Sequence, residues 1–204
     1  MKQLITTIPL KNLSHGGFED ARLFRGVDSK SLQSIDADWR PVFDSAPPES
    51  LPEDAHWEWA DKALRALQNP LNYELFSVEK DDKTQGMLMA IKGGSKCFSR
   101  HHEHPRAPII YVDFLATAPW NRPGLAATSP VYRGVGRVLF MAAVSLSIEE
   151  EFVGRVGLHS LPGAEGFYRQ QLSMTDLGKD DAYYGLRYFE LSANQASQLI
   201  AGGL

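Results

Sequence analysis

The sequence has almost none of the features of secreted, membrane-spanning or nucleic-acid-binding proteins. Its 204 residues contain a single cysteine, Cys97, which cannot form a disulfide within the chain. The first residues, MKQLITTIPLKNL, lack both the apolar core and the small-residue cleavage site of a secretion signal. The longest apolar stretches, such as residues 107–118, are interrupted by proline and aspartate and are too short to span a membrane. We therefore expect a soluble, cytoplasmic protein with no membrane partner.

The charge balance of the chain is slightly acidic. The net charge is −4 and lysine and arginine form no run, so nucleic acid is not an expected partner. Hydrophobic residues make up 43% of the chain and charged residues 23%, which is typical of a folded globular protein. This length fits one core of ordinary size, and we predict a single domain over residues 1–204.

Before residue 73 the pattern is only partly informative. Leu4, Ile5 and Ile8 indicate a short strand, which ends at a glycine turn over residues 15–17. Residues 45–54 are rich in proline and acid and predict a loop. The next segment, residues 55–67, predicts a helix that stops at Asn69-Pro70. Its apolar positions are Trp59, Ala63, Ala66 and Leu67.

From residue 73 onward, strands and helices alternate. Residues 73–79 and 85–91 predict a hairpin around a turn at residues 81–83. Residues 109–117 are apolar on both faces and predict a central strand. Further elements are predicted as a helix from near Gly134 to near Gly154, a strand at 155–161, a short helix at 164–172 and a strand at 183–191. A hairpin pairs antiparallel and a strand–helix–strand unit pairs parallel, so we predict a mixed sheet.

The segment Val131-Tyr132-Arg133-Gly134-Val135-Gly136-Arg137 lies between the central strand and the long helix. Two glycines allow neighbouring backbone N–H groups to turn toward one point, and the helix dipole adds positive charge there. A phosphate fits such a loop. A Walker-type loop would require lysine and Ser/Thr where Arg137 and Val138 stand, and a dinucleotide fingerprint would require a third glycine at Leu139. A pair of close glycines without a ligand is the alternative.

Four segments together resemble the GNAT superfamily of N-acetyltransferases. They are LATAPWN, YRGVGRVLFMAAV, GRVGLHSL and AEGFYRQQLSMTDLG, and the resemblance covers about residues 73–191. It implies an α/β fold with a mixed central sheet, a splayed strand pair and helices on both faces. It also implies that residues 73–191 form an acetyl-CoA-binding core, with acceptor-side helices and a strand in residues 1–72. A homodimer is compatible with the resemblance, but the sequence does not fix the oligomeric state.

The resemblance also implies which residues bind acetyl-coenzyme A. Pantetheine pairs with the central strand near its bulge, and the pyrophosphate lies on the glycine loop. The residues carried over are Leu115, Ala116, Thr117, Arg133, Gly134, Val135, Gly136, Arg137, Val138 and Ser160. The sequence departs from the family where Val131 replaces glutamine or arginine, where residues 119–130 are inserted, and where Ser160 is the nearest substitute for a usual asparagine. Ser129-Pro130 would favour an earlier helix start, but the two glycines make poor interior residues.

Acetyl transfer to an amine requires a neutral amine and a proton for the departing thiolate. The resemblance places Tyr168 where the family often has a tyrosine that protonates the sulfur; packing of the aromatic ring is the alternative. Asp113, an acid within an apolar strand, stands where the family often has a carboxylate facing the acceptor. We expect burial to raise its pKa toward that of a useful base, with a structural aspartate or a water-relayed base as alternatives.

Two further groups of residues are candidate sites. Residues 97–104 contain a thiol and three histidines, but the adjacent His101 and His102 would point apart on a regular backbone, and no metal-binding spacing occurs. We expect no metal there. Trp39, Trp57 and Trp59 fall in the part that forms the acceptor lid in the family, where they would shape an aromatic pocket, with ordinary core packing as the alternative.

The sequence thus predicts an N-acetyltransferase that uses acetyl-CoA as co-substrate and an amine, from a small molecule or a protein, as acceptor. Two alternatives stay open. One is a non-catalytic acyl-CoA sensor that binds a partner, which Val131 and the missing asparagine favour. The other is a toxin that acetylates charged transfer RNA, which the acidic net charge disfavours.

Overall fold

The computed structural model describes residues 2–125 and 129–203. Nine strands are hydrogen-bonded in the order β6-β1-β2-β3-β4-β5-β7-β9-β8 and form a mixed sheet, which confirms the predicted fold class. The chain divides into two compact units. The first unit holds Met1–Pro70, Glu74–Met89 and Phe114–Leu139, and the second unit holds Leu71–Tyr73, Ala90–Asp113 and Phe140–Leu204. A single domain over residues 1–204 stays a prediction.

The first unit begins with a hairpin of two strands, where the sequence predicted one short strand before a glycine turn. Strands β1 (Gln3–Asn12) and β2 (Phe18–Arg25) pair antiparallel, and β2 then pairs with β3 (Tyr73–Lys80). Residues 3–7 of β1 are exposed on both faces, so the alternation of apolar and polar residues that reveals a strand is missing there. The predicted hairpin of β3 and β4 (Lys83–Ile91) is confirmed, with positive φ angles of 51° at Asp81 and 59° at Asp82 in its two-residue turn.

Two helices follow the hairpins of the first unit. Helix α1 (Ser29–Ser45) was not predicted, because its apolar positions are diluted by serine and aspartate and Pro41 lies inside it. Helix α2 (Trp59–Gln68) begins four residues later than predicted. The reason is a distant cap: the Asp36 carboxylate of α1 accepts hydrogen bonds of 2.9 and 3.0 Å from the N–H groups of Trp59 and Ala60. A short 3₁₀ helix, Pro48–Ser50, lies in the predicted loop.

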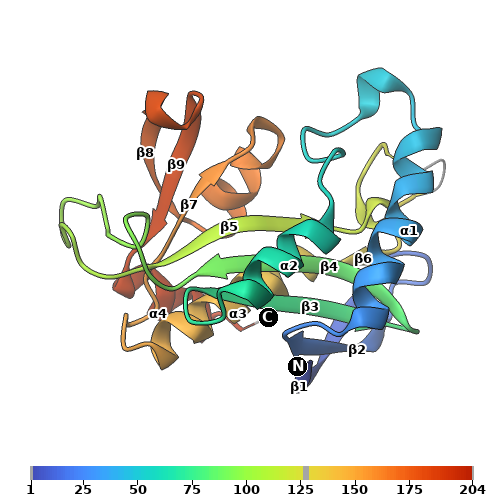
Figure 1. Cartoon of the computed structure of the whole chain (residues 1–204), viewed down its shortest axis with the longest axis horizontal. Helices are drawn as coiled ribbons and strands as arrows, with labels where there is room; N and C mark the ends of the chain where they lie inside the picture. Colours follow the sequence, from blue (N-terminus) through green and yellow to red (C-terminus); the bar gives the residue numbers. More distant parts are fainter. Residues whose placement is uncertain (1, 126–128, 204) are drawn as a thin grey trace. The chain divides into compact units, whose positions relative to one another are not determined.

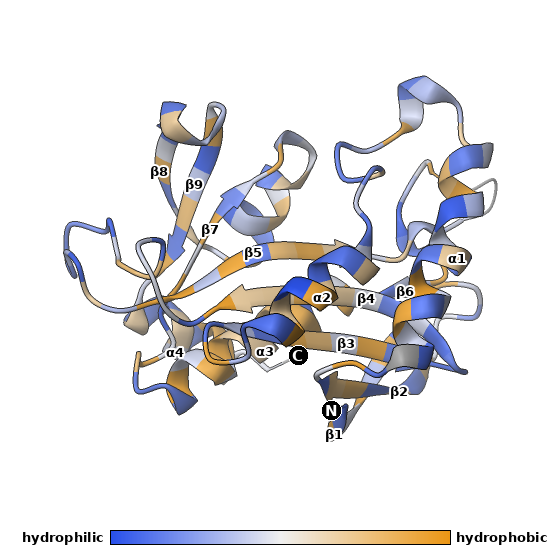
Figure 2. Cartoon of the chain, viewed as in Figure 1, coloured by the Kyte–Doolittle hydropathy of each residue, from blue (hydrophilic) through white to orange (hydrophobic). Residues whose placement is uncertain are grey.

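Neighbouring residues of β4 show that helices cover both faces of this part of the sheet. A Cβ atom added to Gly86 would lie 2.7 Å from Val135 and 2.9 Å from Leu139, both in helix α3 (Val135–Glu149). The next side chain, Gln85, points the other way and accepts a 2.9 Å hydrogen bond from Trp120, whose ring meets Trp39 of α1 edge-on. Figure 1 shows α1 and α2 in front of the strands, and Figure 2 shows the two helices striped in polar and apolar colours.

The second unit contains the parallel pair that the sequence predicted. Strand β5 (Ile110–Thr117) pairs with β7 (Val156–Ser160) at Ile110 with Val156 and at Tyr111 with Gly157. In the described ladder β7 continues along β9 (Leu186–Leu191), so its pairing with β5 is confined to the start of β5. This limited pairing fits the splayed strand pair expected from the resemblance. Strand β8 (Thr175–Asp180) and helix α4 (Ala193–Ala201) were not predicted.

The predicted helix at 164–172 is present in a less regular form. It consists of a 3₁₀ turn, Pro162–Ala164, and a π-helix, Phe167–Gln171, with a 3.1 Å bond from the Leu172 N–H to the Phe167 carbonyl. Another 3₁₀ turn, Asp181–Tyr183, occupies the start of the predicted strand at 183–191. Among the described residues we find no helix that has both the length and the hydrophobicity of a membrane span.

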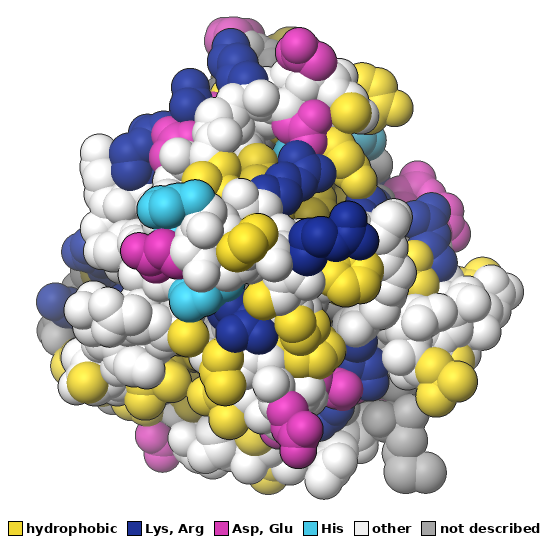
Figure 3. Space-filling view, turned by 90° about the vertical axis from the view of Figure 1, so that its left-hand side faces the viewer, with side chains coloured by type: hydrophobic (Ala, Val, Ile, Leu, Met, Phe, Trp, Pro, Cys, Tyr) yellow, Lys and Arg dark blue, Asp and Glu magenta, His cyan; other side chains and the backbone are white. Residues whose placement is uncertain are grey.

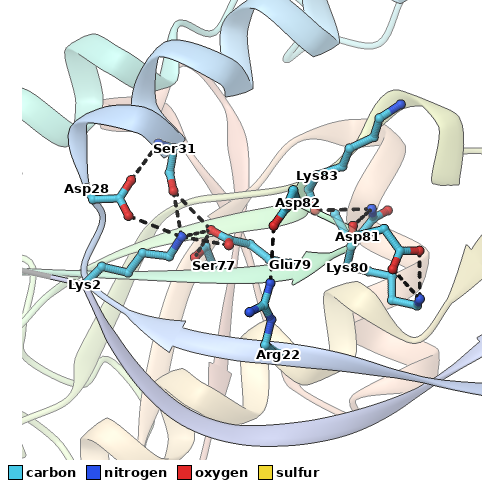
Figure 4. A network of polar contacts seen from close by, with 11 residues as sticks. Lys2, Arg22, Asp28, Ser31, Ser77, Glu79, Lys80, Asp81, Asp82 and Lys83 are labelled. Atoms are coloured by element: carbon cyan, nitrogen blue, oxygen red, sulfur yellow. Dashed lines mark hydrogen bonds and ion pairs between the residues drawn. The ribbon is translucent and has the colours of Figure 1, made fainter.

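A buried ion pair fixes the start of the chain in the first unit. The Lys2 ammonium lies 2.6 Å from a carboxylate oxygen of Glu79 in β3 and 2.7 Å from the hydroxyl oxygen of Ser31 in α1. Figure 4 shows Lys2 pointing at both partners and at Asp28, the N-cap of α1. Beside this network lies a cavity of about 350 Å³. Strand β1 is therefore tied to β3 and α1 through its first residues.

Candidate functional site

The glycine loop of the first unit leads into helix α3, and Gly136 lies in the first turn of that helix. Strand β6 (Tyr132–Arg133) pairs antiparallel with Lys11 and Asn12 of β1. Gly134 follows with a φ angle of +102°, a region that favours glycine, and α3 begins at Val135. The predicted start near Gly134 is confirmed, whereas a start at Ser129-Pro130 is not.

The loop presents backbone donors at the N-terminus of α3. The first bond of the helix runs over 3.0 Å from the Val138 N–H to the Gly134 carbonyl, so the N–H groups of Val135 and Gly136 have no carbonyl of this helix to bind. Val135 and Val138 are buried, while Gly134 is exposed with no atom within 4 Å of an added Cβ. Such a helix end can bind an anion. Arg133 is exposed and Arg137 half-buried.

Glu19 fixes the loop from the β1–β2 hairpin. Its carboxylate accepts hydrogen bonds of 3.0 Å from the Tyr132 hydroxyl and 2.7 Å from the Asn12 amide. Hydrogen bonds from His15, Asn12 and Tyr132 lower the pKa of Glu19 to about 2. The carboxylate is thus charged at neutral pH and keeps Tyr132 in place.

The inserted segment supports the loop from the other side. Its 3₁₀ turn, Pro119–Asn121, docks on Gln85, which accepts hydrogen bonds from the side chains of Trp120 and Asn121. The Asn121 side-chain oxygen then accepts a 2.9 Å bond from the Tyr132 N–H, and the Trp120 carbonyl accepts a 3.0 Å bond from the Val131 N–H. Residues 126–128 of the insertion lie outside the described residues. The inserted segment therefore helps to hold the glycine loop in place.

The end of β5 carries the residues predicted to face pantetheine. Ala116 is buried beside Gly86, whereas Leu115 and Thr117 are half-buried. The Thr117 carbonyl accepts a 2.8 Å bond from Arg122, whose guanidinium also binds both carboxylate oxygens of Asp54 at 2.7 Å. The insertion is thereby joined to the end of β5 and to the segment before α2.

Tyr168 and Ser160 lie in the second unit. Tyr168 is 6% exposed, and its ring packs against Phe140, Phe167 and Phe189 with centroid distances of 6.4, 5.2 and 5.9 Å. The packing role is thus present; a role as general acid stays a prediction. The Ser160 hydroxyl is buried and donates a 2.8 Å bond to the Leu161 carbonyl.

Asp113 is ion-paired, which the sequence did not indicate. One of its carboxylate oxygens lies 2.9 Å from the Lys96 ammonium, and its side chain is only 12% exposed. Lys96 also lies 4.9 Å from the ring centroid of Tyr111 and 5.2 Å from that of Tyr183. If Asp113 acts as a base, it therefore does so beside the ammonium group of Lys96.

A buried chain of polar side chains in the second unit was missed. The Tyr111 hydroxyl lies 2.7 Å from Nδ1 of His159, and Nε2 of His159 lies 3.0 Å from an oxygen of Asp180. Arg100 pairs with the same Asp180 oxygen and, with His159, lowers the pKa of Asp180 to about 2. Burial raises the pKa of Tyr111 and lowers that of His159. The sequence placed His159 on the face opposite Ser160 but gave no partner, because Asp180 lies in an unpredicted strand.

The histidine-rich loop differs from its prediction in one respect. The rings of His101 and His102 stack at 4.7 Å instead of pointing apart, because the backbone turns here and is not regular. Buried Glu190 fixes the loop through the Ser99 hydroxyl at 2.7 Å and the His101 N–H at 3.2 Å. Figure 3, which views the side that carries this loop, shows histidine beside acidic and basic side chains. The described residues contain no cluster of three metal-binding side chains.

The tryptophans of the predicted lid have different surroundings. Trp39 and Trp59 are 4% and 1% exposed and meet edge-on at 6.4 Å, so they belong to the core of the first unit. Trp57 is half-buried and meets the ring of Phe114 in β5 at 4.8 Å. Core packing thus accounts for two of the three.

Neither a protein-family model nor a curated protein sequence matches this chain. Several solved structures, however, are similar to it. The GNAT domain of S. lividans PAT is 13% identical, with a TM-score of 0.56 over 91% of this chain and 95% of that one. A GNAT-family protein from Desulfovibrio desulfuricans is also 13% identical, with a TM-score of 0.52 over 85% of this chain and 99% of its own.

A third similar structure is the PaiA N-acetyltransferase from Thermoplasma acidophilum in complex with coenzyme A. It is 11% identical, and the match has a TM-score of 0.51 over 84% of this chain and 98% of that one. At such identities the likeness concerns the fold. The chain has the fold of GNAT acetyltransferases, as the sequence resemblance implied.

Proposed function

We propose that this protein is an N-acetyltransferase that moves the acetyl group of acetyl-coenzyme A to an amine. The observation that carries the proposal is Gly134, which has a φ angle of +102° directly before the N-terminus of α3. The fold, shared with GNAT acetyltransferases, supports it, and one similar structure contains coenzyme A.

The first unit would hold the coenzyme. The N–H groups at the start of α3 would bind the pyrophosphate, with Arg133 and Arg137 adding positive charge in place of the side chain lost at Val131. Leu115, Ala116 and Thr117 would present β5 backbone to pantetheine. Because Gly134 is exposed and an added Cβ would meet no atom within 4 Å, a phosphate would be able to approach the backbone closely there.

Tyr168 and Asp113 are the residues that we propose for proton transfer. When bound, acetyl-coenzyme A supplies an activated thioester carbonyl. Tyr168 would donate a proton to the departing thiolate, and Asp113 would accept one from the acceptor amine. The hydroxyl of Ser160 donates its proton to the Leu161 carbonyl, so Ser160 would contribute its hydroxyl oxygen as an acceptor or its backbone.

Two linked measurements test the proposal. Titration calorimetry measures coenzyme A binding, and release of free thiol measures turnover over a panel of amines and peptides. Tyr168→Phe keeps the ring but lacks the acidic hydroxyl, so turnover should fall about ten- to a thousandfold with coenzyme A affinity unchanged. Tyr184→Phe, at a residue that is 98% exposed, is the matched control. Absence of coenzyme A binding would reject the proposed function.

A non-catalytic acyl-CoA sensor is the second candidate. The ion pair between Asp113 and Lys96 favours it, because the Lys96 ammonium already contacts the carboxylate that an enzyme would use for the acceptor amine. A sensor would bind coenzyme A in the calorimeter yet release no thiol with any acceptor in the panel. The same two measurements therefore separate the candidates.

A further inference from the structure

Trp57 and Phe114 form an aromatic corner in the first unit. Their ring centroids are 4.8 Å apart and their planes meet at 86°. Trp57 lies just before α2 and Phe114 lies in β5, and both are half-buried. The Lys62 ammonium, on the first turns of α2, is 3.9 Å from the Phe114 centroid and 5.2 Å from that of Trp57. The corner therefore already binds a primary ammonium group.

The geometry suits cation binding better than other cation–ring contacts of the first unit. An aromatic ring attracts a cation that lies over its face within about 6 Å, and two rings attract it more strongly. Lys2 and Lys83, by comparison, lie over one ring each, at 4.5 Å from Phe24 and 5.8 Å from Trp120. Lys62 lies over two rings, and its distance to Phe114 is the shortest of these.

Packing alone does not account for the corner. The two other tryptophans of this region, Trp39 and Trp59, are buried, whereas Trp57 and Phe114 keep part of their surface in contact with solvent. Half-exposed aromatic rings that face a cation are a common means of binding ammonium ligands. A ligand that displaced the Lys62 ammonium from the corner would reach both rings.

We propose that the aromatic corner binds an alkylammonium group of the acceptor and that Lys62 occupies the corner when no acceptor is bound. This inference rests on the proposed function, because it concerns the amine substrate. A cation held by two rings stays protonated, whereas the amine that attacks the thioester must be neutral. The corner thus binds a second, non-reacting ammonium group. The acceptor class is an alkylamine with at least two cationic groups, such as a diamine or a lysine-containing peptide.

The test uses tetramethylammonium, a cation that cannot be acetylated, and tert-butanol as a neutral probe of similar size. Binding is followed by nuclear magnetic resonance of the tryptophan indole groups, without acetyl-coenzyme A. Lys62→Met should bind tetramethylammonium about tenfold more tightly than the unaltered protein, since the corner is vacated. Lys62→Arg, which keeps a cation, should not. Lys83→Met, which removes the cation over Trp120, is the matched control and should also show no gain.

Adding Trp57→Leu to Lys62→Met should abolish the gain. The proposal is overturned if Lys62→Met shows no gain, if tert-butanol gains equally, or if the gain survives loss of Trp57. Near-ultraviolet circular dichroism checks that each variant folds. If Lys62→Met does not fold, Lys62→Gln, which also removes the cation, takes its place and should show the same gain. Coenzyme A titration is independent of these probes, so failure of the corner and failure of the proposed function give different results.

Discussion

The hydroxyl of Tyr132 donates a hydrogen bond of 3.0 Å to Glu19, which connects the residue two positions before Gly134 to the β1–β2 hairpin. Because Tyr132 also pairs with Asn12 of β1, the loop is fixed by both backbone and side chain. The hairpin, far from the loop in sequence, therefore sets where the N-terminus of α3 points.

The first prediction concerns pH. The pKa of Glu19 is about 2 in the folded protein, against an ordinary value of 4.5. Its contribution to stability is thus fully present above pH 4.5 and is lost as pH falls from 4.5 toward 2. Glu19→Gln should lower the melting temperature at pH 7, and the difference from the unaltered protein should shrink across that window. Glu49→Gln, at an exposed carboxylate, is the control and should be neutral. A difference independent of pH would contradict the assignment.

The second prediction concerns Gly134. A Cβ at Gly134 or at Gly166 would meet no atom within 4 Å, but φ is +102° at Gly134 and −62° at Gly166. Gly134→Ala should therefore cost about 1–3 kcal/mol of unfolding free energy from backbone strain alone, whereas Gly166→Ala should cost nothing. Denaturant titration measures both. Gly134→Ala should also weaken coenzyme A binding in the calorimeter, and equal stability of the two variants would show that the loop conformation is wrong.

The sequence predicted those elements in which local pattern and burial agree. The β3–β4 turn, β5 and the start of α3 are such elements, because aspartates, β-branched residues and two glycines each favour one conformation. The start of α2 could not be predicted, since its cap is Asp36, more than twenty residues away. Strand β8 was missed because all its residues are partly exposed and show no apolar alternation.

The candidate site shows the same division. Glycine-loop residues are adjacent in sequence and could be named from it. The partners of Asp113 and His159 are Lys96 and Asp180, which lie in a loop and an unpredicted strand. Ion pairs and hydrogen bonds between distant segments leave no periodic signal in the sequence. The charged and polar groups that surround a site can therefore be identified only once the fold is known.

The third prediction concerns the ion pair of Lys2 and Glu79. Their side chains are only 14% and 8% exposed, so Lys2→Met leaves a buried carboxylate without its cation. The unfolding free energy should drop by about 3 kcal/mol, seen as a melting temperature lower by about 10 °C. Arg22→Met breaks an exposed pair with Asp82 in the same network and should cost less than about 1 kcal/mol. A Lys2→Met/Glu79→Gln double variant should recover part of the loss. Equal effects of Lys2→Met and Arg22→Met would contradict the prediction.

The fourth prediction decides the role of Asp113. A base must be ionised to accept a proton from the acceptor ammonium, so activity should fall at acidic pH. Asp113→Asn keeps the shape but accepts no proton; turnover should drop by about two to four powers of ten, and the acidic limb of the pH–rate profile should move or vanish. Asp181→Asn, which removes an exposed carboxylate of the second unit, is the control.

Lys96→Met makes the test of Asp113 specific. Lys96→Met removes the ammonium that lies 2.9 Å from the Asp113 carboxylate, so turnover and the acidic limb of the rate profile should both change if Asp113 is the base. A purely structural aspartate predicts a different pattern: both variants would melt at lower temperature, and the acidic limb of the remaining folded enzyme would stay where it is. Rate profiles and melting temperatures of the two variants, measured together, therefore separate the roles. Two stable variants with unaltered profiles would exclude both, leaving the proton to a water-relayed base.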